Sequence, residues 1–183
     1  MAQPGSVDER ISSAALQLLR TGGPRAVTME AVAAASGVAK TTIYRRHRDR
    51  RDLLTTTLSS LATPAPLDPA SEPPDRLRGL IDRTVEIVEN GVGLGGVAAM
   101  LTDEDPEYST LFRHILSDRR GHLTSVIDAC KADGSMRGDV DAATLIDAIV
   151  GAYLVEYARS GDVAAGWSTR LFDLLWPAVR PPH

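Results

Sequence analysis

Apolar residues recur at every third or fourth position along much of this chain, and no stretch keeps the strict alternation that predicts a strand. Ser6 is positioned as an N-cap, and the glycines at 22 and 23 end the first apolar stripe, so we expect a helix over residues 7–21. Abundant alanine and leucine, with aromatic residues at only 4%, also favour helices. The first stripe consists of Val7, Ile11, Ala14, Ala15, Leu18 and Leu19.

The same spacing predicts further helices along the chain. Thr28 and Asp49 are positioned to cap two of them. Residues 63–74 contain five prolines and predict a linker or rigid loop. The sequence therefore predicts an all-α protein of about nine helices. After the first, the expected ranges are 29–35, 39–46, a helix following Asp49, 75–90, 95–103, 106–133, 141–159 and 163–179.

Three features limit the cellular compartment. The single cysteine, Cys130, excludes an intramolecular disulfide and fits a reducing environment. No apolar run reaches the roughly 20 residues that span a bilayer. The first ten residues, MAQPGSVDER, lack the apolar core of a secretory signal. We therefore expect a cytoplasmic protein that does not bind membranes.

Charge is divided unevenly along the chain. Residues 1–62 contain nine Lys or Arg and five Asp or Glu, a net charge of +4, whereas the remainder carries −8. The segment SGVAKTTIYRRHRDR, at 36–50, holds most of the positive charge. A basic segment on an acidic body indicates one module that faces nucleic acid and one that faces something else. A run of charges is equally typical of a solvated surface, so this alternative stays open.

The segment MEAVAAASGVAKTTIYRRHR, at 29–48, has the pattern of a helix-turn-helix. Ala33 is small where two helices would approach each other, and Gly37 follows at the turn. Val32, Val38 and Ile43 would form a small core. The exposed face of the second helix would then reach phosphates and base edges in a major groove. That face carries Lys40, Thr41, Thr42, Tyr44, Arg45 and Arg46, although Tyr44 also fits a packed position.

Residues 7–54 resemble the N-terminal domain of TetR/AcrR-family transcriptional regulators, most closely in VTMEAVAAASGVAKTTIYRRHRDRRDLL at 27–54. The shared features are a first helix ended by glycine and followed by Val-Thr, the Val-Ala and Gly-Val pairs, a Thr-Ile-Tyr core, and a basic residue before the leucines of the fourth helix. The resemblance implies an all-helical homodimer that inserts its third helices into the major groove of double-stranded DNA. It also implies a C-terminal domain with an effector pocket and the dimer interface.

Site roles follow from the resemblance position by position. Thr28 and Arg50 are implied to contact phosphate, with Arg50 standing where the family usually has lysine. His47 stands where an aromatic or apolar residue is common, which leaves the packing of the third and fourth helices open. The implied division is a helix-turn-helix domain at 1–52 and an effector-binding and dimerisation domain at 53–183. Lys40, Thr41, Thr42 and Tyr44 are implied to read bases and backbone, flanked by Arg45 and Arg46.

The body helix 142–155 is apolar on nearly all sides, and the last helix is similarly broad. Because a surface helix of a monomer has one apolar stripe, we expect a second subunit to cover the other side. A helix buried centrally in a monomer is the alternative. The expected interface residues are Leu145, Ile149, Tyr153, Leu171, Leu174 and Leu175.

A pocket for a largely hydrophobic effector is expected among the body helices, although core packing explains the same residues. Its expected walls are Val97, Met100, Leu101, Phe112, Ile115, Leu116 and Tyr153.

Two other patterns carry weaker indications. Gly91, Gly93 and Gly96 match G-x-G-x-x-G, but the helical spacing before them predicts a flexible joint rather than a dinucleotide site. The residues at 114, 118 and 122 (His, Asp, His) share a helix face, but neighbouring arginines disfavour a metal. We expect no metal, no cofactor and no catalytic residue.

The sequence thus predicts a dimeric, sequence-specific DNA-binding regulator, namely a repressor that a small effector releases from a palindromic operator. Two other classes stay open. One is a helical enzyme or carrier whose basic segment is only a solvated surface. The other is a nucleic-acid-binding protein without sequence preference.

Overall fold

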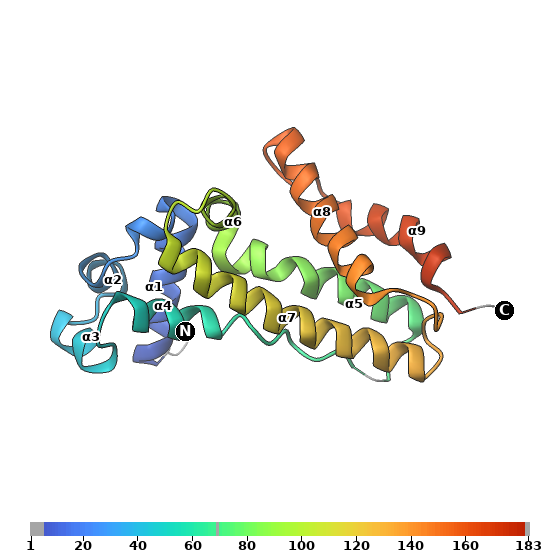
Figure 1. Cartoon of the computed structure of the whole chain (residues 1–183), viewed down its shortest axis with the longest axis horizontal. Coiled ribbons are helices and arrows are strands. Elements are labelled where there is room, and N and C mark those ends of the chain that lie inside the picture. The colour runs from blue at the N-terminus through green and yellow to red at the C-terminus, as the bar shows by residue number, and fades with distance from the viewer. Residues whose placement is uncertain (1–5, 69, 182–183) are drawn as a thin grey trace, which may run out of the picture. The chain divides into compact units, whose positions relative to one another are not determined.

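The computed structural model describes residues 6–68 and 70–181, and within these ranges the chain forms helices and no strand (Figure 1). The all-α prediction is therefore confirmed. A 3₁₀ turn, η1 (Pro24–Ala26), follows the first helix, and an irregular stretch, η2 (Ile87–Val92), follows the fifth. The α-helices are α1 (Val7–Gly22), α2 (Met29–Ser36), α3 (Lys40–Arg46), α4 (Arg50–Ser59), α5 (Pro73–Glu86), α6 (Gly93–Leu101), α7 (Pro106–Ala132), α8 (Ala142–Ser160) and α9 (Trp167–Val179).

Polar caps fix the starts of several helices. The Ser6 hydroxyl accepts from the Glu9 N–H, and the Glu9 carboxylate accepts from the Ser6 N–H, which completes a capping box at α1. Thr28 caps α2 and Asp49 caps α4 with the side chain alone, by accepting from the N–H of Ala31 and of Asp52, as the sequence predicted. Each cap satisfies a backbone donor that the helix leaves unpaired, so these starts follow from local chemistry alone.

The helix expected over 75–90 is present as α5 followed by a wider π-helical stretch, η2, and the chain leaves helical geometry at Gly91, where φ is −94° and ψ is −108°. One predicted helix start is wrong. The last helix, expected from residue 163, begins at Trp167, after Gly166 adopts a left-handed conformation with φ of 76°. Pro69 of the proline-rich linker lies outside the described residues.

The chain divides into two compact units. Unit 1 consists of Met1–Ala62 and Ile87–Ser117, and unit 2 consists of Thr63–Glu86 and Asp118–His183. In unit 1, α1 packs against α2, α4 and α6. Ile11 and Leu19 of α1 are buried there together with Leu54 of α4. The boundary expected between residues 52 and 53 falls inside α4, so these compact units divide the chain differently from the expected functional domains.

In unit 2, α5 packs against α8 and α9. Leu80 is fully buried, and the Arg78 guanidinium lies 3.8 Å from the centre of the Phe172 ring. The proline-rich segment is tied to α5, because Arg83 donates hydrogen bonds to the carbonyls of Ala65 (2.5 Å) and Pro66 (2.7 Å). This segment is therefore part of unit 2 rather than a free linker.

One stretch, Pro73–Leu101, is long and apolar enough to cross a membrane by length and composition. Half of its most apolar window is buried within the structure. Such burial is typical of a core segment, since apolar side chains that face protein are already removed from water.

The glycines at 91, 93 and 96 lie where neighbouring atoms approach closely. Gly93 has φ of +70°, and an added Cβ there would lie 2.9 Å from Cγ of Arg20. A Cβ on Gly96 would lie 2.7 Å from the Tyr108 hydroxyl oxygen and 2.8 Å from Cβ of Val92. Close packing in unit 1 therefore accounts for these glycines without a flexible joint.

We predict that Gly96→Ala lowers the free energy of unfolding by about 1–3 kcal/mol, because the added methyl group overpacks a core position. Tyr108 is fully buried and has little room to move away. The control is Gly121→Ala in α7, where an added Cβ meets nothing within 4 Å. In this control the free energy of unfolding should rise by up to about 1 kcal/mol, because alanine has a higher helix propensity than glycine. Urea unfolding followed by circular dichroism measures both, and a Gly96→Ala variant as stable as the unmodified chain would contradict the packing argument.

Candidate nucleic-acid interface

Helices α2 and α3 form the predicted helix-turn-helix. Gly37 ends α2 in a left-handed conformation with φ of 65°, and its N–H donates to the Ala33 carbonyl at 3.1 Å. Val32 and Ile43 are fully buried and Val38 is nearly so. The small core expected from the sequence is therefore confirmed. At seven residues, α3 is too short to be stable alone, so this packing fixes its position.

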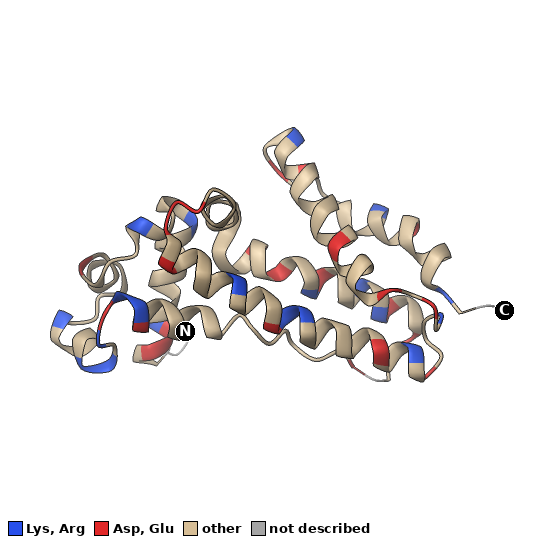
Figure 2. Ribbon diagram, viewed as in Figure 1, with Lys and Arg blue, Asp and Glu red and all other residues tan. Residues whose placement is uncertain are grey.

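The outer face of α3 carries most of the predicted DNA-reading side chains. Tyr44 is 46% exposed, so it is not a core residue. Figure 2 shows Lys and Arg gathered on α3 and at the start of α4. Thr28 is exposed at the N-cap of α2, where its oxygen accepts from the Ala31 N–H at 3.1 Å and its own proton remains a donor. Lys40, Thr41, Arg45 and Arg46 are exposed as well, and Thr42 is half-buried.

A carboxylate from α2, which the sequence analysis did not connect with α3, contacts this face. Glu30 lies 2.6 Å from the Lys40 ammonium and accepts a hydrogen bond from the Tyr44 hydroxyl at 3.3 Å. The Lys40 ammonium lies 5.8 Å from the centre of the Tyr44 ring. The hydrogen bond with Lys40 holds the pKa of Glu30 below its usual value and raises the pKa of Lys40. One acidic side chain thus orients two of the predicted reading residues.

The two arginines at the end of α3 differ in their surroundings. Arg46 donates two hydrogen bonds to the Asp8 carboxylate of α1, at 2.7 and 2.8 Å. The side chain of Arg45 makes no hydrogen bond or ion pair within the described part of the chain. Because exposed ion pairs stabilise a protein by only about 0–1 kcal/mol, a phosphate can displace Asp8 at small cost.

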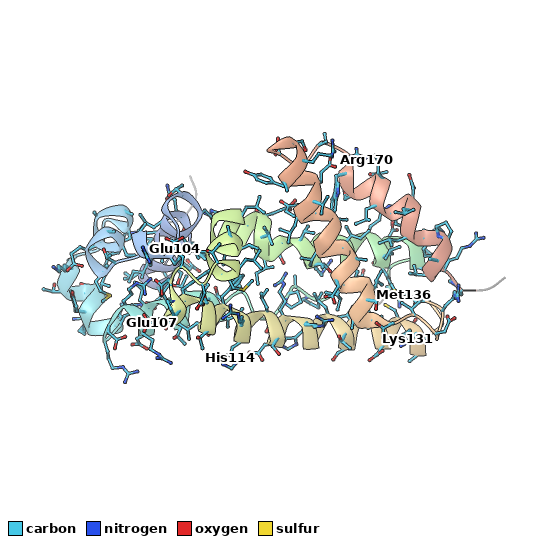
Figure 3. The ribbon with its side chains drawn as sticks, turned by 45° about the horizontal axis from the view of Figure 1, so that its top comes forward. Glu104, Glu107, His114, Lys131, Met136 and Arg170 are labelled. Atoms are coloured by element: carbon cyan, nitrogen blue, oxygen red, sulfur yellow. The ribbon has the colours of Figure 1, made fainter. Side chains whose placement is uncertain are left out.

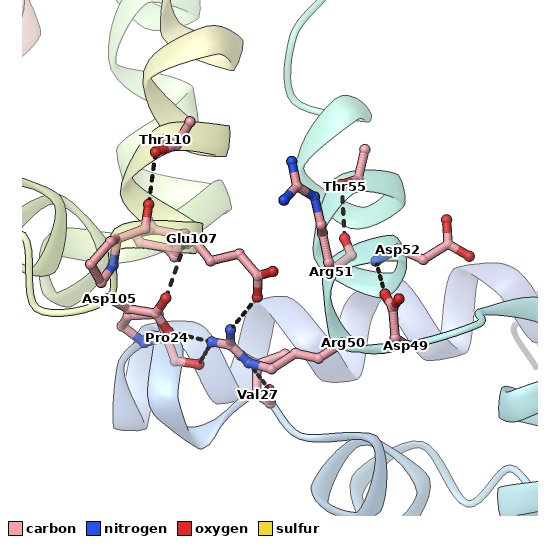
Figure 4. Close-up of polar contacts among 12 residues, drawn as sticks. Pro24, Val27, Asp49, Arg50, Arg51, Asp52, Thr55, Asp105, Glu107 and Thr110 are labelled. Atoms are coloured by element: carbon pink, nitrogen blue, oxygen red, sulfur yellow. Dashed lines mark hydrogen bonds and ion pairs between the residues drawn. The ribbon is translucent and has the colours of Figure 1, made fainter.

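Arg50 is placed differently from the other predicted DNA contacts. Its side chain is only 26% exposed, and it donates hydrogen bonds to the Pro24 and Val27 carbonyls and to the carboxylates of Asp105 and Glu107 (Figure 4). The phosphate contact implied for Arg50 stays a prediction. Its observed partners lie inside unit 1.

His47 ends α3 and is 5% exposed, and its N–H donates to the Ile43 carbonyl at 2.8 Å. Its ring atom Nδ1 is buried without a hydrogen-bond partner among the described residues. The imidazole is therefore buried at the position where the resemblance led us to expect an aromatic or apolar side chain.

The expected pocket residues do not share one environment. Val97, Phe112 and Ile115 are buried in unit 1, whereas Leu101 is 71% exposed. Tyr153 belongs to unit 2, where its ring meets that of Trp167 edge-on at 5.3 Å. Core packing accounts for the buried residues but not for Leu101. The remaining two, Met100 and Leu116, are half-buried.

The expected dimer residues are divided as well. Leu174 is 73% exposed, but most of the others are buried within unit 2. The sequence analysis missed Val155 of α8, which is 65% exposed. Leu145, Ile149, Tyr153 and Leu171 are the buried ones, and Leu175 is half-buried.

The residues considered as metal ligands do not form a cluster. His114 (Figure 3) belongs to unit 1, and Asp118 and His122 belong to unit 2. The His122 ring lies 3.4 Å from the Thr63 hydroxyl. Within the described ranges, no three His, Cys, Asp or Glu side chains come together as a metal site.

Residues 11–56 match the family model of the bacterial regulatory proteins of the tetR family. The match includes the whole helix-turn-helix and the start of α4. Residues 11–56 therefore carry the N-terminal domain of this family, and α2 and α3 form its helix-turn-helix.

Solved structures of regulators share the fold over nearly the whole chain. TylP, a tetR regulator from Streptomyces fradiae, is 18% identical with a TM-score of 0.67, and the match covers 96% of this chain and 87% of that one. A protein from Saccharomonospora viridis described as a transcriptional regulator, in complex with choline, is 19% identical with a TM-score of 0.66, covering 96% and 98%. FadR from Bacillus subtilis, in complex with stearoyl-CoA, is 16% identical with a TM-score of 0.60, covering 91% and 96%. A comparison with curated proteins gives no significant match.

We predict that Glu30→Gln raises the affinity for non-operator DNA about two- to fivefold, because Lys40 is no longer held in a weak, exposed ion pair. The measurement is fluorescence anisotropy with a labelled duplex of arbitrary sequence at low salt. Asp82→Asn is the control for net charge, since Asp82 is exposed and makes no ion pair within the described residues. Equal gains in both variants would show that net charge, and not the release of Lys40, is responsible.

Proposed function

We propose that this chain is a regulator of the tetR family: a cytoplasmic homodimeric repressor that binds a palindromic operator and is released by a small, largely apolar effector. The observation that carries the proposal is the exposed face of α3, where Lys40 and Tyr44 project from a helix whose opposite side is fixed by the buried Ile43. A two-fold protein that presents two such helices matches a DNA site with two-fold symmetry.

Electrostatics support DNA as the partner of this face. Lys40 and Arg46 are paired with exposed carboxylates, Glu30 and Asp8, which occupy the places that phosphates or base acceptors would take. Arg45 adds a cation without a protein partner in the described residues. Binding to DNA would exchange the weak carboxylate pairs for phosphate contacts and would release condensed counterions. We therefore expect a steep dependence of affinity on salt.

We predict that Lys40→Ala and Tyr44→Ala each reduce operator affinity about 5- to 150-fold, which corresponds to about 1–3 kcal/mol per base contact. If Lys40 also contacts phosphate, its removal should lower the slope of log affinity against log salt by about 0.9. Tyr44→Ala should leave that slope unchanged. Fluorescence anisotropy with a duplex from the region upstream of the chain's own gene, at several salt concentrations, measures both quantities.

Lys131→Ala, in unit 2, is the control and should bind as the unmodified chain does. If Lys40→Ala and Tyr44→Ala both bind the operator as tightly as the unmodified chain does, the outer face of α3 is not the face that reads DNA. Binding of the unmodified chain without preference over a scrambled duplex would favour a nonspecific nucleic-acid-binding protein. Failure to bind any duplex would favour the enzyme or carrier alternative.

The outward face of α8 and α9 supports the homodimer. Val155 and Leu174 are highly exposed and line an open groove of about 270 Å³ in unit 2. An added Cβ on Gly151, one turn before Val155, meets nothing within 4 Å. Exposed apolar side chains beside a position with free space fit a surface that a second copy covers. The buried residues expected at the interface instead form the core of the subunit itself.

We predict that Leu174→Glu weakens dimerisation at least tenfold, because it places a charge at the centre of an apolar contact. Size-exclusion chromatography with light scattering over a concentration series measures the mass. Leu101→Glu is a matched control, because Leu101 is a leucine of similar exposure in unit 1. An unmodified chain that is monomeric at all concentrations would contradict the homodimer, and a Leu174→Glu variant that remains dimeric would contradict the assigned face.

Apolar side chains in unit 1 support the proposed effector class. Val97, Phe112 and Ile115 are buried close to the start of α7 in sequence. Tyr108 stacks on Phe112 with 5.5 Å between ring centres, and its buried hydroxyl has no hydrogen-bond partner among the described residues. Burial raises the pKa of Tyr108, so its hydroxyl stays a neutral donor. A mostly apolar molecule with one hydrogen-bond acceptor fits this chemistry.

A further inference from the structure

Arg50 stands at the first turn of α4 and holds the connection between α1 and α2 (Figure 4). Its Nη2 donates to the Pro24 carbonyl at 2.8 Å, and its Nε donates to the Val27 carbonyl at 2.9 Å. Val27 directly precedes Thr28, the N-cap of α2. Arg50 is therefore bonded to the backbone that sets where the helix-turn-helix begins.

The same guanidinium binds the start of α7. Nη2 lies 2.5 Å from the Asp105 carboxylate, and Nη1 lies 2.9 Å from the Glu107 carboxylate. The Asp105 side chain is only 12% exposed. Its other oxygen accepts from the Tyr108 N–H at 3.1 Å and so caps α7. Charge-assisted hydrogen bonds shielded from water are the stronger kind, so this contact is stiffer than the exposed pairs on α3.

Two further arginines bind the same part of unit 1. Arg25 of η1 donates to the Glu104 carbonyl at 2.8 Å and lies 3.7 Å from the Glu104 carboxylate. Arg20 of α1 donates to the carbonyls of Asn90 and Gly91, at 2.9 and 3.0 Å. Figure 3 labels Glu104 and Glu107 at the two sides of the turn into α7. Three cations from the N-terminal helices thus hold residues 90–107.

We propose that Arg50 is a positioning residue that latches the helix-turn-helix to the start of α7, and that it is not a phosphate contact. Four of its five N–H groups are directed to protein acceptors, which leaves one for DNA. A displacement of Asp105 and Glu107 must therefore either move the α1–α2 connection with it or break these hydrogen bonds. Arg50 couples the effector region of unit 1 to the reading helix.

The proposal rests on the proposed function, because the latch positions a DNA-reading helix. Its test uses the full-length chain and the variants Arg50→Ala, Arg50→Lys and Asp105→Ser. Serine at position 105 keeps an N-cap for α7 but lacks the carboxylate that Arg50 binds. Lysine at position 50 keeps the charge but loses the planar fork that serves several acceptors at once. The probe is a duplex that the unmodified chain selects from a random-sequence library.

We predict that all three variants bind this duplex at least tenfold more weakly than the unmodified chain. The slope of log affinity against log salt should stay unchanged, since no phosphate contact is lost. The double variant Arg50→Ala, Asp105→Ser should bind no more weakly than Arg50→Ala alone, because Arg50→Ala already removes the contact with Asp105. A phosphate contact would give the opposite pattern. Arg50→Ala would lower the slope by about 0.9, and Asp105→Ser would bind as tightly as the unmodified chain or more tightly.

Hydrogen exchange without DNA tests the latch separately. Amide protons of residues 25–28 and of residues 102–109 should both exchange at least tenfold faster in Arg50→Ala and in Asp105→Ser. Arg51→Ala, at the exposed neighbouring position, should leave both segments unchanged. Unchanged exchange in the Arg50 and Asp105 variants would overturn the latch.

A chain that selects no duplex would refute the proposed function, while hydrogen exchange would still decide the latch. Should Arg50→Ala fail to fold, Arg50→Lys and Asp105→Ser still provide the comparison.

Discussion

The structure of unit 1 depends on burial of the apolar side of α1. Ile11 and Leu19 are removed from water as α1 packs against α2, α4 and α6. The reading helix α3 has seven residues and cannot hold its shape in isolation. The packing of unit 1 therefore fixes the position of α3, through the fully buried side chain of Ile43. The hydrophobic effect fixes the location of α3, and the polar face that remains exposed is then free to serve recognition.

The ion pairs of unit 1 are of two kinds, which differ in how far their side chains are exposed to water. Lys40 and Arg46 make exposed pairs with Glu30 and Asp8, and such pairs are weak enough to be exchanged for DNA. Arg50 makes pairs of the same chemical kind, but its partner Asp105 is only 12% exposed. Removal of one member would leave a poorly solvated charge, so that contact resists exchange. The same residue type thus serves recognition at one position and rigidity at another.

Local chemistry made the helix-turn-helix predictable. The Ser6, Thr28 and Asp49 caps, the left-handed Gly37 and the spacing of small and apolar residues all act within a few positions of one another. The partners of Arg50 were not predictable in this way, because Asp105 lies 55 positions away in sequence. The spacing of apolar residues also did not show which side of α8 is buried in the subunit and which is exposed. It marked an apolar helix, but nothing local distinguishes the buried Ile149 from the exposed Val155.

The sequence by itself determined the all-helical class, the starts of most helices and the residues that α3 presents, because hydrogen bonding at helix ends and helical spacing are short-range effects. Only the tertiary structure decided what each charged side chain pairs with and which apolar side of a helix meets the core. Those outcomes depend on segments far apart in the chain. Arg50 shows the difference. Its position in the sequence, before the leucines of α4, implied a contact with phosphate, whereas in the folded chain it donates to four acceptors within the protein.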